Sequence, residues 1–245
     1  MKQAMIFAAG IGTRLKPITD SMPKALVKVG GQPLIYHVIM KLRAAGFERV
    51  VVNVHHFADQ IITYLAENDN FGLDIRISDE RERLLETGGG IKKALALFDA
   101  GSQILIHNVD ILSNVDLSAF YEVAGDNDAT LLVSRRKTKR YLLFDETVRL
   151  RGWTNVETGE VIMDCERGAI RRDELDMLAF SGIHVVSPSV FSCFEEMPER
   201  FGIMEFYLKW CGKFRFQGYL KDDLKMIDVG KLDMLDQAEK FVAGS

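Results

Sequence analysis

Residues 5–24 read MIFAAGIGTRLKPITDSMPK and carry the most informative pattern in the chain. The apolar run over residues 4–8 predicts a buried strand. The strand leads into Gly10 and Gly12, which lack side chains and so let backbone N–H groups come close to a ligand. The same stretch supplies a hydroxyl and three cations, on Thr13, Arg14, Lys16 and Lys24. A strand end, a glycine-rich loop and several cations together predict a cradle for a triphosphate.

Two other glycine-rich phosphate sites fit this stretch poorly. A dinucleotide-binding fingerprint requires a third glycine at position 15, where this chain has Leu15. A P-loop requires a Gly-Lys-Ser/Thr triplet at the start of a helix, and the sequence contains no such triplet. Pro17 and Pro23 also argue against a long helix directly after the loop. We therefore expect an extended loop and disfavour a nicotinamide-dependent dehydrogenase.

The length and composition suit a single α/β domain with a substantial core. The chain has 245 residues, of which 47% are hydrophobic. Its net charge of −4 argues against a general nucleic-acid-binding protein, because such proteins carry basic stripes. One basic stretch, residues 135–140, departs from this balance. We interpret it as a solvated loop between strands and keep a phosphate contact from part of it as the alternative.

The cysteines and histidines show no metal-ligand spacing. The three cysteines are scattered, and His55 and His56, the one adjacent histidine pair, would point to opposite faces of a strand. The sequence also has no signal peptide and no apolar run long enough to span a bilayer. We therefore expect a cytoplasmic protein with no membrane partner.

Strand and helix patterns alternate through the first half of the chain, which is typical of a mostly parallel sheet covered on both faces. Short runs between residues 140 and 170 instead predict antiparallel hairpins. We expect one domain, residues 1–245, with a Rossmann-like three-layer α/β/α architecture and a small hairpin region. The predicted strands cover residues 4–8, 25–29, 49–54, 73–78, 103–108, 129–134, 178–186 and 225–229. The predicted helices cover residues 33–45, 58–67, 90–98, 116–124, 188–196, 204–211 and 232–242.

Two aspartates follow predicted strands. Asp110 comes after the run 104–109, and Asp228 comes after the run 224–227. Ligands of open α/β sheets bind beyond the carboxyl ends of the strands, and one or two carboxylates are the usual protein ligands of Mg²⁺. Taken alone, each aspartate is more simply explained as a strand-terminal cap, so the magnesium assignment depends on the cradle motif.

Residues 85–91, LETGGGI, form a third candidate site. Three glycines that lead into a helix expose backbone donors and acceptors, which suits a flat base lying against the main chain. Taken alone, a flexible loop with a glycine at the helix start is the simpler interpretation.

These motifs resemble those of the sugar-1-phosphate nucleotidyltransferases. The family's N-terminal motif is matched by residues 7–14 and closes at residues 23–24. Its Asn-Gly-Asp element corresponds to residues 108–110, and its late Asp-Val-Gly element corresponds to residues 228–230. Val109 replaces the usual glycine, and its branched side chain is expected to narrow the room beside the sugar.

The resemblance implies a Mg²⁺-dependent enzyme that converts a nucleoside triphosphate and a sugar 1-phosphate to a nucleotide sugar and pyrophosphate. It implies that Arg14 holds pyrophosphate and that Lys24 bridges phosphates near the α-phosphorus. The metal ligands are expected to be Asp110 and Asp228. The nucleotide is expected to contact Ala8, Ala9, Gly10, Gly12, Thr13, Thr87, Gly88 and Gly89, and the sugar is expected to contact Asn108 and Gly182.

Residues 85–91 and 178–184, together with the small size, most resemble the uridylyltransferases that act on N-acetylmuramic acid 1-phosphate in peptidoglycan recycling. We therefore expect UTP to be the preferred nucleotide. The mannose- and heptose-1-phosphate guanylyltransferases share many of these features and form the alternative. A non-catalytic regulatory subunit that binds nucleotide sugars is a further alternative. It is disfavoured because the expected metal ligands are retained, which a pure binding protein could lose.

Overall fold

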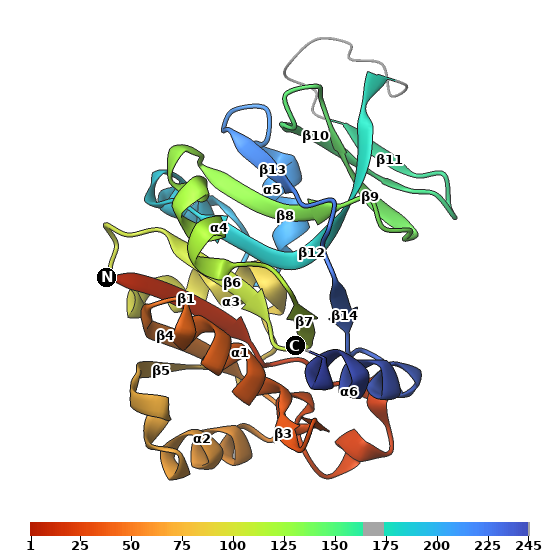
Figure 1. Cartoon of the computed structure of the whole chain (residues 1–245). Helices are drawn as coiled ribbons and strands as arrows, with labels where there is room; N and C mark the ends of the chain where they lie inside the picture. Colours follow the sequence, from red (N-terminus) through yellow and green to blue (C-terminus); the bar gives the residue numbers. More distant parts are fainter. Residues whose placement is uncertain (164–173, 245) are drawn as a thin grey trace.

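The computed structural model describes residues 1–163 and 174–244, and within them it contains a ten-stranded mixed sheet (Figure 1). One half of the sheet is parallel, as predicted. Its strands run side by side in the order β5 (Asp74–Asp79), β4 (Phe47–Val54), β1 (Lys2–Phe7) and β6 (Ile104–Asn108).

The other half of the sheet is mostly antiparallel and is built on one long strand, β12 (Asp176–Val186). This strand pairs antiparallel with β6, β8 (Ala129–Ser134) and β9 (Arg140–Phe144). The predicted hairpins continue from β9 through β10 (Leu150–Asn155) and β11 (Val161–Met163); the rest of the predicted hairpin stretch, up to residue 170, includes residues outside the described ranges. A strand that the sequence patterns did not indicate, β13 (Phe216–Leu220), pairs parallel with β8.

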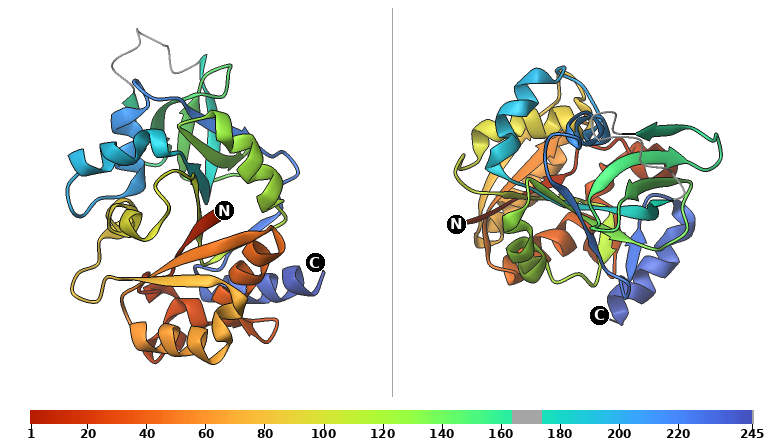
Figure 2. Two further views of the ribbon diagram at one scale, coloured as in Figure 1. Left: turned by 90° about the vertical axis from the view of Figure 1, so that its left-hand side faces the viewer. Right: turned by 90° about the horizontal axis from the view of Figure 1, so that it is seen from above.

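Helices cover both faces of this sheet (Figure 2). Successive residues of β1 alternate between the two layers: Ala4 and Ile6 pack into one core, and Met5 packs into the other. The continuous apolar run that predicted β1 therefore follows from burial on both faces. The first layer holds α1 (Leu34–Ala44), α2 (Ala58–Glu67), α4 (Leu117–Val123) and α6 (Leu235–Ala243). The second layer holds α3 (Glu86–Ala94), α5 (Ile203–Trp210) and the 3-10 segment Pro188–Glu196.

Several predicted elements need correction. The strand predicted over residues 25–29 is a 3-10 turn followed by the short strand β2 (Lys28–Val29), which pairs with β3 (Gln32–Pro33). The strand that ends at Asp228, β14 (Met226–Asp228), does not join the main sheet and instead pairs antiparallel with β7 (Ile111–Ser113). No helix in the described ranges has the length and apolar character needed to cross a bilayer.

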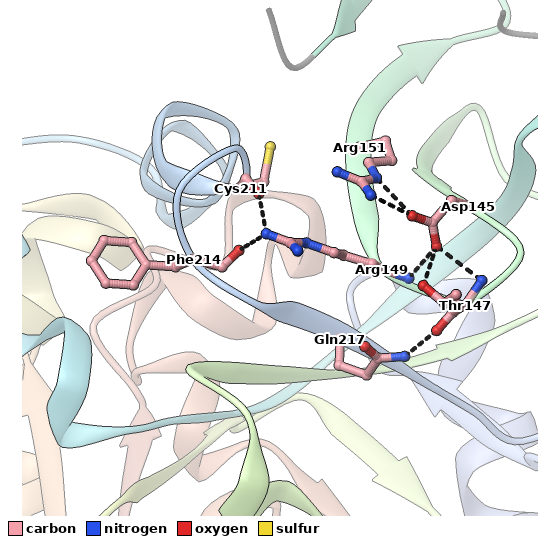
Figure 3. Close-up of polar contacts among 7 residues, drawn as sticks. All are labelled: Asp145, Thr147, Arg149, Arg151, Cys211, Phe214 and Gln217. Carbon is pink, nitrogen blue, oxygen red and sulfur yellow. Dashed lines mark hydrogen bonds and ion pairs between the residues drawn. The ribbon is translucent and has the colours of Figure 1, made fainter. Parts of the chain in front are cut away.

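A half-buried carboxylate, that of Asp145, fixes the turn between β9 and β10 (Figure 3). Asp145 Oδ1 accepts hydrogen bonds from Thr147 Oγ1 (2.6 Å) and from the backbone N–H of Arg149 (3.0 Å), while Oδ2 accepts from Arg151 Nε (2.7 Å). The Arg149 side chain donates to the carbonyl oxygen of Phe214 (2.9 Å) and so ties the hairpin to the chain after α5. Burial works to raise the pKa of Asp145, but these hydrogen bonds lower it overall.

We expect Asp145→Asn to lower the free energy of unfolding by about 1–3 kcal/mol at neutral pH, because the amide has no charge and an NH₂ group replaces one of the two oxygen atoms that accept hydrogen bonds. Glu146→Gln in the same turn is the control and should change it by less than about 0.5 kcal/mol. The pKa of Asp145 is lower in the folded state than in the unfolded chain. The ionised carboxylate therefore stabilises the fold at pH values above the ordinary pKa of aspartate, and this contribution is lost as the pH falls through the lowered pKa. Urea unfolding at neutral and acidic pH tests this, and a difference between the variants that persists at the lowest pH would contradict it.

Candidate active site

The loop after β1 is held by Asn53, which lies beside Phe7 near the end of β4. The Asn53 Oδ1 atom accepts hydrogen bonds from the backbone N–H groups of Ala8 (2.8 Å) and Ala9 (3.3 Å). Both N–H groups, on residues expected to contact a nucleotide, are therefore already bonded within the protein. These two hydrogen bonds to a side chain of the neighbouring strand fix the direction in which the loop leaves β1.

A buried glutamate extends this contact to the start of α3. Asn53 Nδ2 donates to Glu80 Oε1 (2.8 Å), and Glu80 Oε2 accepts from the backbone N–H of Leu85 (3.0 Å). Asn53 and Glu80 are only 2% and 1% exposed. This pair was not predicted, although Asn53 is a polar residue inside the apolar run of β4 and could have indicated it.

The middle of the loop presents its backbone to solvent. Gly10 is exposed, and a Cβ atom there would meet no heavy atom within 4 Å. Gly12 has φ +70°, and a Cβ there would stand 3.0 Å from the Cβ of Lys24, so both its conformation and its surroundings favour glycine. Thr13 and Arg14 are exposed and open a 3-10 turn. A bare backbone, a hydroxyl and a guanidinium thus lie together, as the sequence predicted.

A cavity of about 390 Å³ opens beside this loop. The parallel half of the sheet supplies one wall through the ends of β1, β4 and β6, and the start of α3 supplies another. A volume of this size is typical of small-molecule sites. The lining residues are Phe7, Ala9, Gly10, Lys24, Asn53, Leu84, Glu86, Thr87, Asn108, Val109 and Asp110.

Acidic and basic side chains meet at the floor of the cavity. The ammonium group of Lys24, which is 8% exposed, donates a hydrogen bond to the carboxylate of Asp110. The backbone N–H of Val229 donates to the carbonyl oxygen of Asp110 (2.8 Å), which brings Asp228 alongside. Burial raises the pKa of Asp228, and the charge of Asp110 raises it further. Asp110 lies in the turn between β6 and β7, and Asp228 ends β14, which pairs with β7, so the two carboxylates, together called the carboxylate centre, lie near one another.

Gly230 allows a cation to approach this centre. A Cβ at Gly230 would stand 2.7 Å from Asp228 Oδ1 and 2.9 Å from Arg14 Nη2. The missing side chain leaves room for both Arg14 and Asp228 beside Gly230, and the charge of Arg14 works to lower the pKa of that carboxyl group. The Asp-Val-Gly element thus contributes a carboxylate and also the space beside it.

The expected sugar side lies where β12 bulges. Between Phe180 and His184 the pairing of β12 with β8 shifts, and Gly182 within this bulge has φ +74°. A Cβ at Gly182 would stand 2.6 Å from Asn108 Nδ2, so the bulge packs closely on the end of β6. Asn108 and Gly182, predicted together from the sequence, are therefore in contact.

The glycines of residues 88–90 make packing contacts that the sequence did not indicate, and the expected contact of Gly88 and Gly89 with a nucleotide stays a prediction. Helix α3 begins at Glu86, so they lie inside its first turns rather than in a loop before it. The N–H groups of Gly88 and Gly89 both donate to the carbonyl oxygen of Phe201 (2.9 and 3.1 Å), and a Cβ at Gly89 would stand 2.3 Å from Glu199 O. These glycines allow α3 to pack against the segment before α5. Thr87 lines the cavity, and its contact with a base stays a prediction.

Comparison with known proteins identifies a family through the part of the chain that contains the loop, α3 and Asp110. The model of the nucleotidyl transferase family matches residues 3–142, which include the whole loop, α3 and Asp110. The chain belongs to this family. A member from Caulobacter vibrioides, N-acetylmuramate alpha-1-phosphate uridylyltransferase, is 40% identical over 197 residues, which cover 77% of this chain and 76% of the relative. The D-glycero-alpha-D-manno-heptose 1-phosphate guanylyltransferase of Aneurinibacillus thermoaerophilus is 26% identical over 97% of each chain.

Solved structures of other proteins share the fold. HddC from Yersinia pseudotuberculosis, complexed with GMP-PN, has a TM-score of 0.77 at 22% identity and covers 98% of this chain and 99% of its own. A UDP-glucose pyrophosphorylase complexed with UDP-glucose also has a TM-score of 0.77, at 15% identity, and covers 100% of this chain and 99% of its own. The α/β class predicted from the sequence is thereby confirmed.

We expect Asn53→Ala to lower the free energy of unfolding by about 1–3 kcal/mol, because the buried N–H groups of Ala8 and Ala9 and the carboxylate of Glu80 would lose a partner. Ser78→Ala on the neighbouring strand is the control. Ser78 pairs in register with Asn53 and is buried, and its hydroxyl has no hydrogen-bond partner among the described residues. Equal losses for the two variants in urea unfolding would show that the Asn53 contacts contribute nothing beyond burial.

Proposed function

We propose that this protein transfers a nucleotidyl group from a nucleoside triphosphate to a sugar 1-phosphate and releases pyrophosphate. One observation carries the proposal: a single cavity is lined by the glycine-rich loop, Lys24 and Asp110, and the backbone contact of Val229 to Asp110 brings Asp228 next to it. The loop and cations suit a triphosphate, and the carboxylates suit a divalent metal ion. Membership in the nucleotidyl transferase family supports the same reaction class. A purely regulatory subunit would not need the carboxylate centre.

The carboxylate centre fits Mg²⁺. Within the described ranges no group of three or more His, Cys, Asp and Glu side chains is arranged to hold a metal ion, so the protein offers the pair Asp110 and Asp228. One or two carboxylates completed by phosphates and water are the usual surroundings of Mg²⁺. Burial, and after it the charge of Asp110, disfavours the ionised form of Asp228, and a cation bound beside the two carboxylates would favour it. When bound there, Mg²⁺ would neutralise charge on phosphate oxygens.

The side chains divide the remaining tasks. The sugar phosphate oxygen attacks the α-phosphorus in line, and the bond from the α-phosphorus to the pyrophosphate oxygen breaks. Arg14 binds the leaving pyrophosphate with its planar fork, and Lys24 moves from Asp110 to phosphate oxygens near the α-phosphorus. Positioning and charge neutralisation account for catalysis, because phosphoryl chemistry needs little covalent help from the protein.

We propose UTP and N-acetylmuramic acid 1-phosphate as the substrates. The support is the 40% identity to the uridylyltransferase from Caulobacter vibrioides and a second match of 40% to one from Neisseria meningitidis, whose alignment covers 50% of this chain and 53% of that protein. The alternative is a guanylyltransferase for a heptose or mannose 1-phosphate. Its support is the end-to-end match, at 26% identity, to the heptose 1-phosphate guanylyltransferase.

Steady-state pyrophosphate release tests the substrates. We expect the highest kcat/KM for UTP with N-acetylmuramic acid 1-phosphate among pairings of UTP and GTP with this sugar, mannose 1-phosphate and heptose 1-phosphate. A site that hydrogen-bonds one base rejects another strongly, because buried polar groups are then left unpaired. A GTP preference with mannose or heptose 1-phosphate would refute the substrate assignment and retain the reaction class. No pyrophosphate from any pair would refute the function.

Replacement of Asp110 by Asn should reduce kcat by at least about a hundredfold, since loss of charge neutralisation at a metal costs several kcal/mol of barrier. The protein should still fold, because the backbone contact to Val229 does not involve the carboxylate. Asp20→Asn is the matched control: Asp20 lies in the segment that precedes Lys24, and within the part of the chain that the structure describes its carboxylate pairs only with exposed Lys16 at 3.0 Å. Near-normal turnover of a folded Asp110→Asn protein would exclude the proposed role.

A further inference from the structure

The basic stretch over residues 135–140 contains one residue that differs from its neighbours. Arg135 makes ion pairs with Asp176 (3.4 Å) and Asp222 (3.7 Å), and Lys139 pairs with Glu157 (2.6 Å) on the surface. These two residues agree with the solvated loop expected from the sequence. Arg136 is exposed as well, but its side chain binds the backbone of β12.

Arg136 is directed toward the active site. Its Nη2 atom donates to the carbonyl oxygen of Phe180 (2.8 Å), the residue at which β12 begins to bulge. That is the bulge in which Gly182 packs on Asn108. The charges of Arg136 and Asp228 act on one another, so the guanidinium also belongs to the field of the carboxylate centre.

The charges of two guanidinium groups from different elements therefore act on the same aspartate. Arg14 comes from the loop after β1 and lies near Gly230, on the side expected to hold the triphosphate. Arg136 comes from the segment after β8 and is fastened to the bulge on the expected sugar side. The reaction brings two phosphates of like charge together, so the attacking phosphate needs a cation that the triphosphate does not occupy.

We propose that Arg136 binds the phosphate of the sugar 1-phosphate and holds it for attack. This assignment rests on the proposed function. A guanidinium offers two parallel N–H groups to phosphate oxygens, and the hydrogen bond to Phe180 leaves other N–H groups of Arg136 for that purpose. In the reaction one phosphate oxygen forms the new bond to the α-phosphorus, pyrophosphate departs with the electron pair of the broken bond, and Arg136 remains protonated throughout.

A carboxylate on an acidic sugar presents the same chemistry as the phosphate, and the experiment separates the two sources. KM values are measured for the nucleotide and for two acceptors, N-acetylmuramic acid 1-phosphate and N-acetylglucosamine 1-phosphate, which lacks the carboxylate. An acceptor that is not turned over is compared by calorimetric Kd in the presence of Mg²⁺ and a non-hydrolysable nucleotide. The variants are Arg136→Gln, Arg136→Lys and the neighbouring control Arg135→Gln, with thermal unfolding to confirm that each folds.

For Arg136→Gln we expect the KM or Kd of both acceptors to rise at least about tenfold while the nucleotide KM stays within about twofold, because one charged phosphate contact is lost. Arg136→Lys should recover part of the affinity, because it keeps the charge without the fork. Arg135→Gln should resemble the unsubstituted protein. An effect limited to the carboxylate-bearing acceptor, an equal rise for nucleotide and acceptor, or an unchanged acceptor affinity would each overturn the assignment and leave the function standing. An unsubstituted protein without turnover would refute both.

Discussion

The contact between the Asn53 amide and the first two N–H groups of the loop connects the sheet to the site. Asn53 binds Ala8 and Ala9 through its oxygen and binds Glu80 through its nitrogen, and Glu80 in turn binds the N–H of Leu85. Two segments that line the cavity thus leave the sheet in directions set by one buried pair. A buried amide or carboxylate without a hydrogen-bond partner is costly, so these four hydrogen bonds stabilise one another.

Charge balance is the second constraint. Asp110 and Asp228 lie close enough for each charge to disfavour the other, and Lys24, Arg14 and Arg136 offset part of that repulsion. The folded protein therefore keeps an unfavourable carboxylate pair where it binds its ligands, which is a common cost of a functional site. A metal ion and phosphates together would restore the balance, since the cations are then released to bind phosphate oxygens.

Most of the parallel half could be predicted from the sequence because its signals are local. Buried strands are continuous apolar runs, as in β1 and β4, and α2 has the bounds that its helical spacing predicts. Contacts between distant segments could not be predicted in this way. The packing of the α3 glycines could not be predicted because Phe201, whose carbonyl oxygen accepts hydrogen bonds from Gly88 and Gly89, lies more than a hundred residues away. The pairing of β14 with β7 and the hydrogen bond from Arg136 to Phe180 depend on similar long-range contacts.

The two halves of the sheet also correspond to two expected tasks, recognition of the nucleotide and recognition of the sugar. The family model ends at residue 142, within β9, so the shared pattern covers the parallel half, the loop and Asp110. Relatives named for different sugars match this chain. We propose that features that distinguish one acceptor from another lie mainly at the boundary with the other half of the sheet, on the β12 bulge and the hairpins beside it. Val109 and Arg136 stand at this boundary, one through its side-chain volume beside Asn108 and the other through its charge beside Phe180. Sugar selectivity would therefore change through this half of the sheet while the triphosphate loop stays unaltered.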